Sequence, residues 1–198
     1  MEAPPRAGPE LGGGRAAAGD AVDAALEALL DLCADRPWRE VSLRDVAERA
    51  GVSFAALYAR APGKAALLGR LSDRYDREAL RAVDGDPQPE AHDRLFEAFM
   101  ARLDVLGARR DVLIAIGRAE PLLVSRSFGR TARALAEAAG VDTTGGRGAL
   151  RLLALTGVWA RTLQVWRDDE GALNRTMAEI DKRLREASRR LGRVGAGF

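Results

Sequence analysis

The sequence contains one cysteine and one histidine, and these near-absences exclude two kinds of chemistry. A single thiol cannot form an internal disulfide, which is typical of a protein from a reducing compartment. A metal site needs a cluster of ligands, and Cys33 and His92 lie far apart in the sequence. The sequence also lacks the common nucleophile and nucleotide-binding motifs. We therefore expect no enzyme activity, no bound metal and no cofactor.

Long apolar runs and a dominant charge are missing as well. No run is long enough to cross a bilayer, and the first residues lack the hydrophobic segment of a secretory signal. We expect a cytoplasmic protein without stable membrane insertion. The 31 lysines and arginines face 29 acidic residues, which leaves a net charge of +2. This balance provides no general attraction to polyanions, so any contact with nucleic acid must depend on where the cations lie.

Helix-forming residues dominate what is present. Aromatic residues make up only 5% of the sequence, and β-branched residues are sparse. Apolar residues recur at three- and four-residue steps. Together these features predict an all-α fold of about nine helices. Residues 1–18 are rich in Gly, Pro and Ala, so we expect a disordered tail. The strongest break, at 84–90, separates domains at 19–82 and 83–192. Residues 193–198 are expected to be a second flexible tail.

Residues 42–62 carry the local signals of two short helices joined by a tight turn. Ser42 is a good N-cap, with Asp45 at the capping-box position. Gly51 suits the left-handed position that ends a helix, and Ser53 can cap the next helix, which Pro62 ends. The pattern predicts a helix-turn-helix.

The string WREVSLRDVAERAGVSFAALYARAPGKAALL, residues 38–68, resembles the N-terminal domain of TetR-type transcriptional regulators. The matching positions are Trp38, Ser42, Leu43, Val46, Ala47, Ala50, Gly51, Val52, Ser53, Leu57, Tyr58, Lys64 and Leu67. The chain departs from the family pattern at Ala56, Arg60 and Ala61. The resemblance implies a homodimeric transcriptional repressor that binds a double-stranded DNA operator and is released by an apolar small-molecule effector.

In helix-turn-helix proteins the second helix enters the major groove, and flanking groups contact phosphates. The residues expected to contact phosphates are Ser42, Arg44, Tyr58 and Lys64. The residues expected to contact base edges are Ser53, Phe54, Ala55 and Arg60. Two alternatives are that Phe54 packs on the first helix and that the Tyr58 ring lies in the core. Because this helix is mostly apolar, shape readout or Arg6 and Arg15 of the tail would add specificity.

The C-terminal domain is expected to bind the effector and to form the dimer. Candidate ligand-binding residues are Phe96, Phe99, Met100, Leu103, Arg118, Phe128, Trp159, Leu163 and Trp166, although a packed core would use the apolar ones equally well. Apolar residues at heptad-like spacing suggest a two-fold four-helix interface, with internal burial as the alternative. The interface candidates are Leu152, Thr156, Leu173, Met177, Ile180, Leu184 and Leu191.

Two further stretches are similar to the lipid-binding accessory proteins of ubiquinone biosynthesis, which share the TetR fold. These are DRLFEAFMARLDVL at 93–106 and LQVWRDDEGALNRTMAEIDKRLREA at 163–187. In those relatives the C-terminal domain holds a lipid in an apolar cavity. This second resemblance implies an alternative function, a lipid-binding protein with weak or no DNA binding.

Overall fold

The computed structural model describes residues 13–85, 90–169 and 173–198, and the side chains from residue 21 onward within these ranges. In this part of the chain there are ten α-helices, one 3-10 turn and no strand, which confirms the all-α fold. The helices form two compact units that divide between Leu67 and Leu68. The division falls inside helix α4 (Lys64–Val83), whereas the sequence break at 84–90 had placed the boundary after residue 82.

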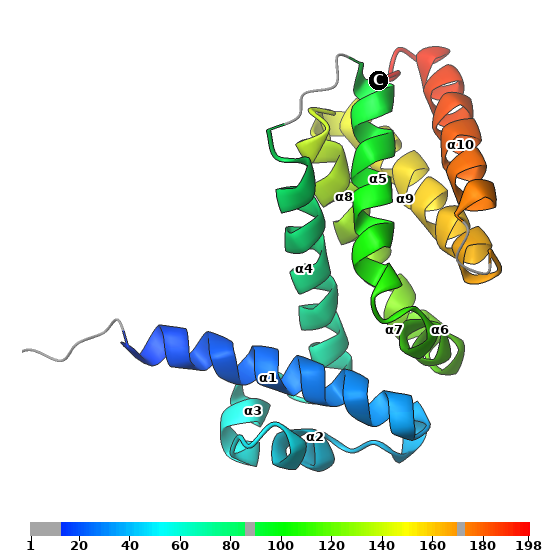
Figure 1. Cartoon of the computed structure of the whole chain (residues 1–198). Helices are drawn as coiled ribbons and strands as arrows, with labels where there is room; N and C mark the ends of the chain where they lie inside the picture. The colour runs from blue at the N-terminus through cyan, green and yellow to red at the C-terminus, as the bar shows by residue number, and fades with distance from the viewer. Residues whose placement is uncertain (1–12, 86–89, 170–172) are drawn as a thin grey trace, which may run out of the picture. The chain divides into compact units, whose positions relative to one another are not determined.

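The first unit contains α1 (Gly13–Asp35), the 3-10 turn η1 (Trp38–Glu40), α2 (Leu43–Arg49) and α3 (Phe54–Arg60). Helix α1 lies across α2 and α3 (Figure 1) and buries Leu26, Leu29 and Leu30. The expected N-terminal tail is corrected in part. Residues 1–12 lie outside the described residues, but residues 13–18 belong to α1. The alanines at 16–18 extend the helix because alanine has the highest helix propensity, even without an apolar face.

The local signals of the helix-turn-helix are confirmed. The Ser42 Oγ accepts a hydrogen bond of 3.1 Å from the Asp45 backbone N–H, and an Asp45 carboxylate oxygen accepts one of 2.9 Å from the Ser42 N–H. Hydrogen bonds from the Ser42 backbone N–H and from the Ser42 hydroxyl lower the pKa of the Asp45 carboxyl below its ordinary value. Gly51 has the left-handed φ of +66° that ends α2. The Ser53 Oγ accepts the Ala56 N–H at 3.2 Å and caps α3.

A Ser42→Ala variant is expected to lower the free energy of unfolding by about 1 kcal/mol at pH 7, because the cap hydroxyl is lost. The Asp45 part of the box depends on pH. Since its folded pKa is lowered, its stabilising effect is present above the unfolded value of about 3.9 and is lost as the pH falls through the folded pKa. Urea unfolding at pH 7 and pH 3 measures both effects. Ser125→Ala, at an exposed serine of α7, is the control, and equal losses in both variants would contradict the assignment.

The second unit contains the rest of α4 and six further helices. They are α5 (Ala91–Gly107), α6 (Arg110–Ala119), α7 (Pro121–Ser125), α8 (Phe128–Ala138), α9 (Gly145–Arg167) and α10 (Asn174–Gly192). Helices α5, α8, α9 and α10 form a four-helix arrangement in which α9 packs against α8 and α10, and α5 packs against the same two (Figure 1). Its core is built from buried aromatic and aliphatic side chains, among them Leu95, Phe99, Leu135, Leu155, Trp159, Ile180 and Leu184.

Two short helices follow Pro121 in place of one long helix. Helix α7 ends at Ser125, and α8 begins at Phe128. The hydroxyls of Ser125 and Ser127 donate to carbonyls three residues earlier, which competes with a continuous helix. The glycines at 145, 146 and 148 lie in the first turn of α9, which begins at Gly145. Among the described residues, no helix is both long enough and apolar enough to span a membrane.

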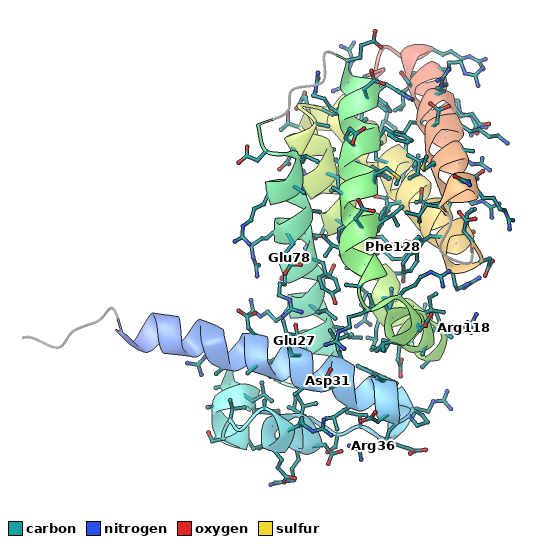
Figure 2. All side chains as sticks on the ribbon, viewed as in Figure 1. Glu27, Asp31, Arg36, Glu78, Arg118 and Phe128 are labelled. Atoms are coloured by element: carbon teal, nitrogen blue, oxygen red, sulfur yellow. The ribbon has the colours of Figure 1, made fainter. Side chains whose placement is uncertain are left out.

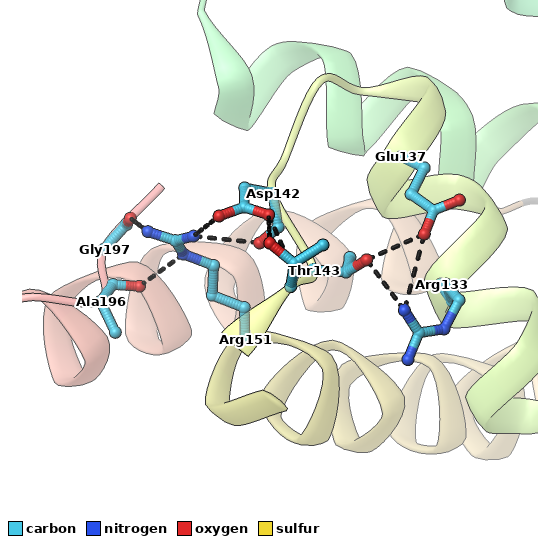
Figure 3. Close-up of polar contacts among 8 residues, drawn as sticks. Arg133, Glu137, Asp142, Thr143, Arg151, Ala196 and Gly197 are labelled. Carbon is cyan, nitrogen blue, oxygen red and sulfur yellow. Dashed lines mark hydrogen bonds and ion pairs between the residues drawn. The ribbon is translucent and has the colours of Figure 1, made fainter. Parts of the chain in front are cut away.

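The expected flexible tail at 193–198 is wrong, because Arg151 holds this segment against the domain (Figure 3). Its Nε donates to the Ala196 carbonyl at 3.0 Å, and its Nη2 donates to the Gly197 carbonyl at 3.2 Å. Its Nη1 donates to the Asp142 carbonyl at 3.0 Å. Ala196 is fully buried, and the Phe198 side chain packs against the core. One arginine thus joins the 140–144 loop, α9 and the last residues.

Candidate functional site

The surface of α2 and α3 carries two exposed aromatic side chains, which are 38% exposed at Phe54 and 53% exposed at Tyr58. Their ring centroids lie 5.8 Å apart. The Arg44 guanidinium carbon lies 5.1 Å from the Phe54 centroid, within the range of a cation–π contact. We call Arg44, Phe54 and Tyr58 the aromatic–arginine stack. It presents a cation, an apolar ring and a phenol hydroxyl on one surface.

The alternative that the Tyr58 ring lies in the core is wrong. Leu57 is buried, whereas Tyr58 is the more exposed of the two aromatic residues. The stack contacts also argue against Phe54 serving only to pack on the first helix, because its ring lies between Arg44 and Tyr58. Both aromatic rings are therefore accessible to a partner.

The other expected DNA-contacting residues of α2 and α3 are exposed too. Ser42 and Ser53 accept backbone hydrogen bonds as caps. The Ser42 hydroxyl also hydrogen-bonds to the Asp45 carboxylate. Ala55 is exposed at the start of α3. The exposed Arg60 side chain turns back along α3, and its Nη1 donates to the Ala56 carbonyl at 3.1 Å. This contact places its charge beside the first turns of the helix.

Lys64 has a structural role that the sequence did not reveal. Its ammonium group donates a 2.6 Å hydrogen bond to the Trp38 carbonyl and lies 4.3 Å from the centroid of the Trp38 ring. The side chain is half-buried and ties η1 to the beginning of α4. Its contact with phosphate remains a prediction.

Positive charge is concentrated in the part of the chain that forms the helix-turn-helix. Residues 36–64 contain six basic and three acidic side chains, although the whole chain carries only +2. Among the basic residues, Arg39, Arg44, Arg49 and Arg60 are exposed. The local positive charge that contact with nucleic acid requires is therefore present where the exposed aromatic rings lie.

In the second unit, most candidate ligand-binding residues pack together. Phe99, Leu103, Trp159 and Trp166 are buried, and Phe96, Met100, Phe128 and Leu163 are partly buried against the same cluster. Phe99 and Trp159 meet edge to face with centroids 5.6 Å apart. Arg118 does not share their burial, because its side chain is exposed on α6 (Figure 2). The buried aromatic residues thus pack in the core, and their contact with a ligand remains a prediction.

The sequence did not reveal a buried polar cluster inside this unit, formed by Asp76, Arg102 and Thr131. The Arg102 Nε donates to an Asp76 oxygen at 2.7 Å, and the Thr131 hydroxyl lies 3.0 and 3.1 Å from the two Asp76 oxygens. Arg102 is only 4% exposed. Its guanidinium carbon lies 5.4 Å from the Tyr75 centroid and 5.9 Å from the Trp159 centroid. Burial lowers the pKa of Arg102, and the Asp76 charge opposes this effect.

The sequence contains one sign of this cluster, a charged residue on an apolar helix face, but only the fold identifies its partner. Arg102 lies between the apolar positions Phe99 and Leu103 of α5, and Asp76 follows Tyr75 on α4. A charged residue on an apolar helix face is rarely buried without a partner. The partner lies 26 residues away on another helix, so helical spacing alone does not identify it.

The heptad-like stripe of α10 mostly faces its own subunit. Ile180 and Leu184 are fully buried in the core cluster, and Leu173 is partly buried against it. On α9, Leu152 and Thr156 are half-buried, and the Thr156 hydroxyl donates to the Leu152 carbonyl at 2.7 Å. Met177 is exposed. The three- and four-residue period marks any inward helix face, so it does not distinguish a core from a subunit interface.

The outer face of α9 is a better candidate for contact with a second copy. Leu150 and Leu153 are exposed there, at 45% and 72%. Beside them an open groove of about 370 Å³ runs between α9 and α10. It is lined by Ala154, Gly157, Val158, Arg161, Arg183, Glu186, Ala187, Arg190 and Leu191. Leu191, an expected interface residue, thus reaches this groove.

Neither Cys33 nor His92 belongs to a reactive cluster. Burial raises the pKa of the Cys33 thiol, which keeps it neutral at physiological pH. The His92 Nε2 lies 3.0 Å from an Asp181 oxygen and joins α5 to α10. Among the described side chains, no group of three or more His, Cys, Asp or Glu is arranged to hold a metal ion.

Comparison with known proteins agrees with the geometry of the first unit. Residues 25–71 match the family model described as bacterial regulatory proteins, tetR family. No curated protein matches the chain. The fold is similar to a TetR transcriptional regulator from Nitrosomonas europaea ATCC 19718, with a TM-score of 0.65 at 23% identity, covering 84% of this chain and 96% of that chain. It is also similar to one from Rhodococcus sp. RHA1, with a TM-score of 0.67 at 17% identity, covering 85% and 96%.

Proposed function

We propose, on the premise that residues 25–71 belong to the TetR family of bacterial regulatory proteins, that this protein is a transcriptional regulator that binds duplex DNA. The observation that carries the proposal is the aromatic–arginine stack, exposed on a helix-turn-helix whose caps and turn are intact. An apolar ring can contact a thymine methyl group, and arginine and a phenol hydroxyl can contact phosphates. DNA is the partner that this family implies.

In this proposal α3 enters the major groove. Phe54 and Ala55 contact thymine methyl groups, and Arg60 donates to guanine, because these are the base edges that such side chains recognise. Arg44, Tyr58 and Lys64 contact phosphates, together with the two cap hydroxyls, and set the register of α3. The cation–π contact with Phe54 restricts the Arg44 side chain, so less conformational entropy is lost when it meets a phosphate.

The dependence of duplex affinity on salt tests this proposal. Arg44 and Lys64 provide two cationic phosphate contacts per subunit, and four contacts per dimer give a slope of log affinity against log salt near −3.6. Fluorescence anisotropy with a labelled generic duplex should show an affinity loss of about 10²-fold between 50 and 200 mM salt. No binding at either concentration would reject the proposal.

We further propose that the protein works as a homodimer through the outer face of α9 and the groove beside α10. The exposed leucines 150 and 153 lie on the same side of α9 as Ala154 and Gly157, whose small side chains allow a second helix to approach closely. A two-fold arrangement brings the same patch of both copies together.

A Leu153→Glu variant is expected to weaken dimerisation about tenfold or more, because two-fold symmetry buries an unpaired carboxylate in each half of the interface. Sedimentation equilibrium across a concentration series measures the change. Leu122→Glu is a matched control, since Leu122 is 78% exposed on α7, away from this face. If Leu153→Glu stays dimeric, or if both variants dissociate alike, α9 is not the interface.

The second unit is proposed to bind an apolar effector that releases the protein from DNA, so that it acts as a repressor. Support comes from its aromatic core and from the polar cluster enclosed there. A ligand that favours one packing of the helices shifts the populations of the DNA-binding and released states. Reciprocity requires DNA to weaken effector binding by the same factor as the effector weakens DNA binding.

A further inference from the structure

The cluster around Arg102 leaves three buried polar atoms without a hydrogen-bond partner. They are Arg102 Nη1, Thr162 Oγ1 and Ser72 Oγ, and they come from α5, α9 and α4. Thr162 is completely buried. Unpartnered buried polar atoms are rare in native proteins and mark a place where a further partner fits.

Helical spacing relates the two hydroxyls to the residues that contact the Arg102 guanidinium group. Ser72 lies one helical turn before Asp76, which accepts the Arg102 Nε–H. Thr162 lies three residues after Trp159, whose ring faces the Arg102 guanidinium. Residues three or four apart share a helix face, so both hydroxyls belong to the same side of their helices as the groups that touch Arg102. The surroundings are otherwise aromatic, with Tyr75 on α4.

Charge balance in this cluster indicates what kind of group would bind. The positive charge of Arg102 is already matched by the Asp76 carboxylate, whose oxygens also accept from the Thr131 hydroxyl. A second carboxylate would therefore bring an uncompensated negative charge into the core, which is strongly unfavourable. A neutral oxygen acceptor satisfies Nη1 without adding charge, and the Ser72 and Thr162 hydroxyls can donate to such an oxygen as well.

We propose that the effector is an apolar molecule with a neutral carbonyl oxygen, as in a ketone or an ester, and that this oxygen accepts a hydrogen bond from Arg102 Nη1. Thr162 and Ser72 supply further hydrogen bonds, and the rings of Tyr75 and Trp159 contact the apolar part. The inference rests on the proposed function in taking the bound molecule to be the effector. The binding site itself is testable without DNA.

The test incubates the full chain with equimolar decan-2-one, sodium decanoate and decane, then measures by mass spectrometry what remains bound after gel filtration. The ketone is expected to be retained about tenfold or more over both others, the preference that one hydrogen bond from a charged donor provides. Preferential retention of decanoate overturns the neutral-oxygen assignment. Equal retention of ketone and decane, or retention of none, overturns the site. None of these results alters the salt-dependent duplex binding that tests the proposed function.

Two variants separate recognition from stability. Thr162→Val removes a buried hydroxyl that has no partner, so it should raise the urea midpoint while lowering ketone retention several-fold. Thr176→Val is the matched control: Thr176 is equally buried, but its hydroxyl donates to Asp169 at 2.7 Å. Its midpoint should fall and its ketone retention should stay the same. Unchanged ketone retention in Thr162→Val would overturn the role of Thr162.

A paired replacement tests the guanidinium directly. Arg102→Met with Asp76→Asn removes both charges together, so that no unpaired charge remains, and keeps an acceptor for the Thr131 hydroxyl. The double variant should lose the preference for decan-2-one over decane. A retained preference would show that Arg102 does not bind the carbonyl. If this variant does not fold, the opposite shifts in stability and retention of Thr162→Val still decide the proposal.

Discussion

An Arg60→Ala variant is expected to lose about 10²- to 10⁴-fold in affinity for its preferred operator. A bidentate contact from arginine to guanine contributes about 1–3 kcal/mol, and a symmetric dimer makes that contact in two half-sites. The fold should not suffer, because the Arg60 side chain is exposed and its one described contact is with a carbonyl of its own helix. Anisotropy titrations with the preferred duplex and with a generic duplex measure the loss.

The contrast with Arg44 makes this prediction specific. Arg44→Ala should weaken the preferred and the generic duplex by similar factors and reduce the salt slope by about 1 per subunit, since Arg44 is assigned to phosphate. Arg60→Ala should mainly lower affinity for the preferred duplex and relax the base preference at one position. If both variants lower both affinities equally, Arg60 does not read a base.

A Gly148→Ala variant is expected to lower the free energy of unfolding by about 2–3 kcal/mol, the cost of forcing extra volume into a packed site. A Cβ on Gly148 would lie 2.2 Å from the Thr143 carbonyl carbon and 2.5 Å from its oxygen. Those atoms are backbone, and the neighbouring Thr143 hydroxyl is fixed, since it donates to Glu137 at 2.8 Å and accepts from Arg133 at 3.0 Å (Figure 3). The loop cannot move aside without breaking these bonds.

Gly146→Ala is the matched control for this change. Gly146 lies two residues earlier in the same helix, and a Cβ there meets nothing within 4 Å. Alanine should leave the stability unchanged or raise it by up to about 1 kcal/mol, because it has the higher helix propensity. Urea denaturation followed by circular dichroism compares the two variants. Equal stability of both would show that the 140–144 loop accommodates a side chain at position 148.

The parts of the fold that depend on neighbours in the sequence were predictable. The Ser42 cap, the left-handed Gly51 and the Ser53 cap are confirmed. Each depends only on residues at most four positions away in the sequence. The all-α fold followed from composition and spacing.

The parts that depend on distant residues were not predictable. Spacing could not place Tyr58 at the surface or Ile180 in the core, because several helix faces satisfy the same period. It gave no sign that Arg151 would hold residues 196 and 197, some 45 positions away. It also missed the Asp76–Arg102 pair, in which two charges on separate helices stabilise each other only after the helices have packed.

The measurement that most directly tests DNA recognition is selection of bound sequences from random duplex DNA by the full chain at a stated salt concentration. A symmetric dimer with one α3 helix per half-site should enrich an inverted repeat whose half-sites are one or more helical turns apart, about 34–36 Å per turn. Guanine should be preferred at the position that Arg60 reads. A pool that remains random after repeated selection, even at low ionic strength, would contradict the proposal that this protein recognises DNA.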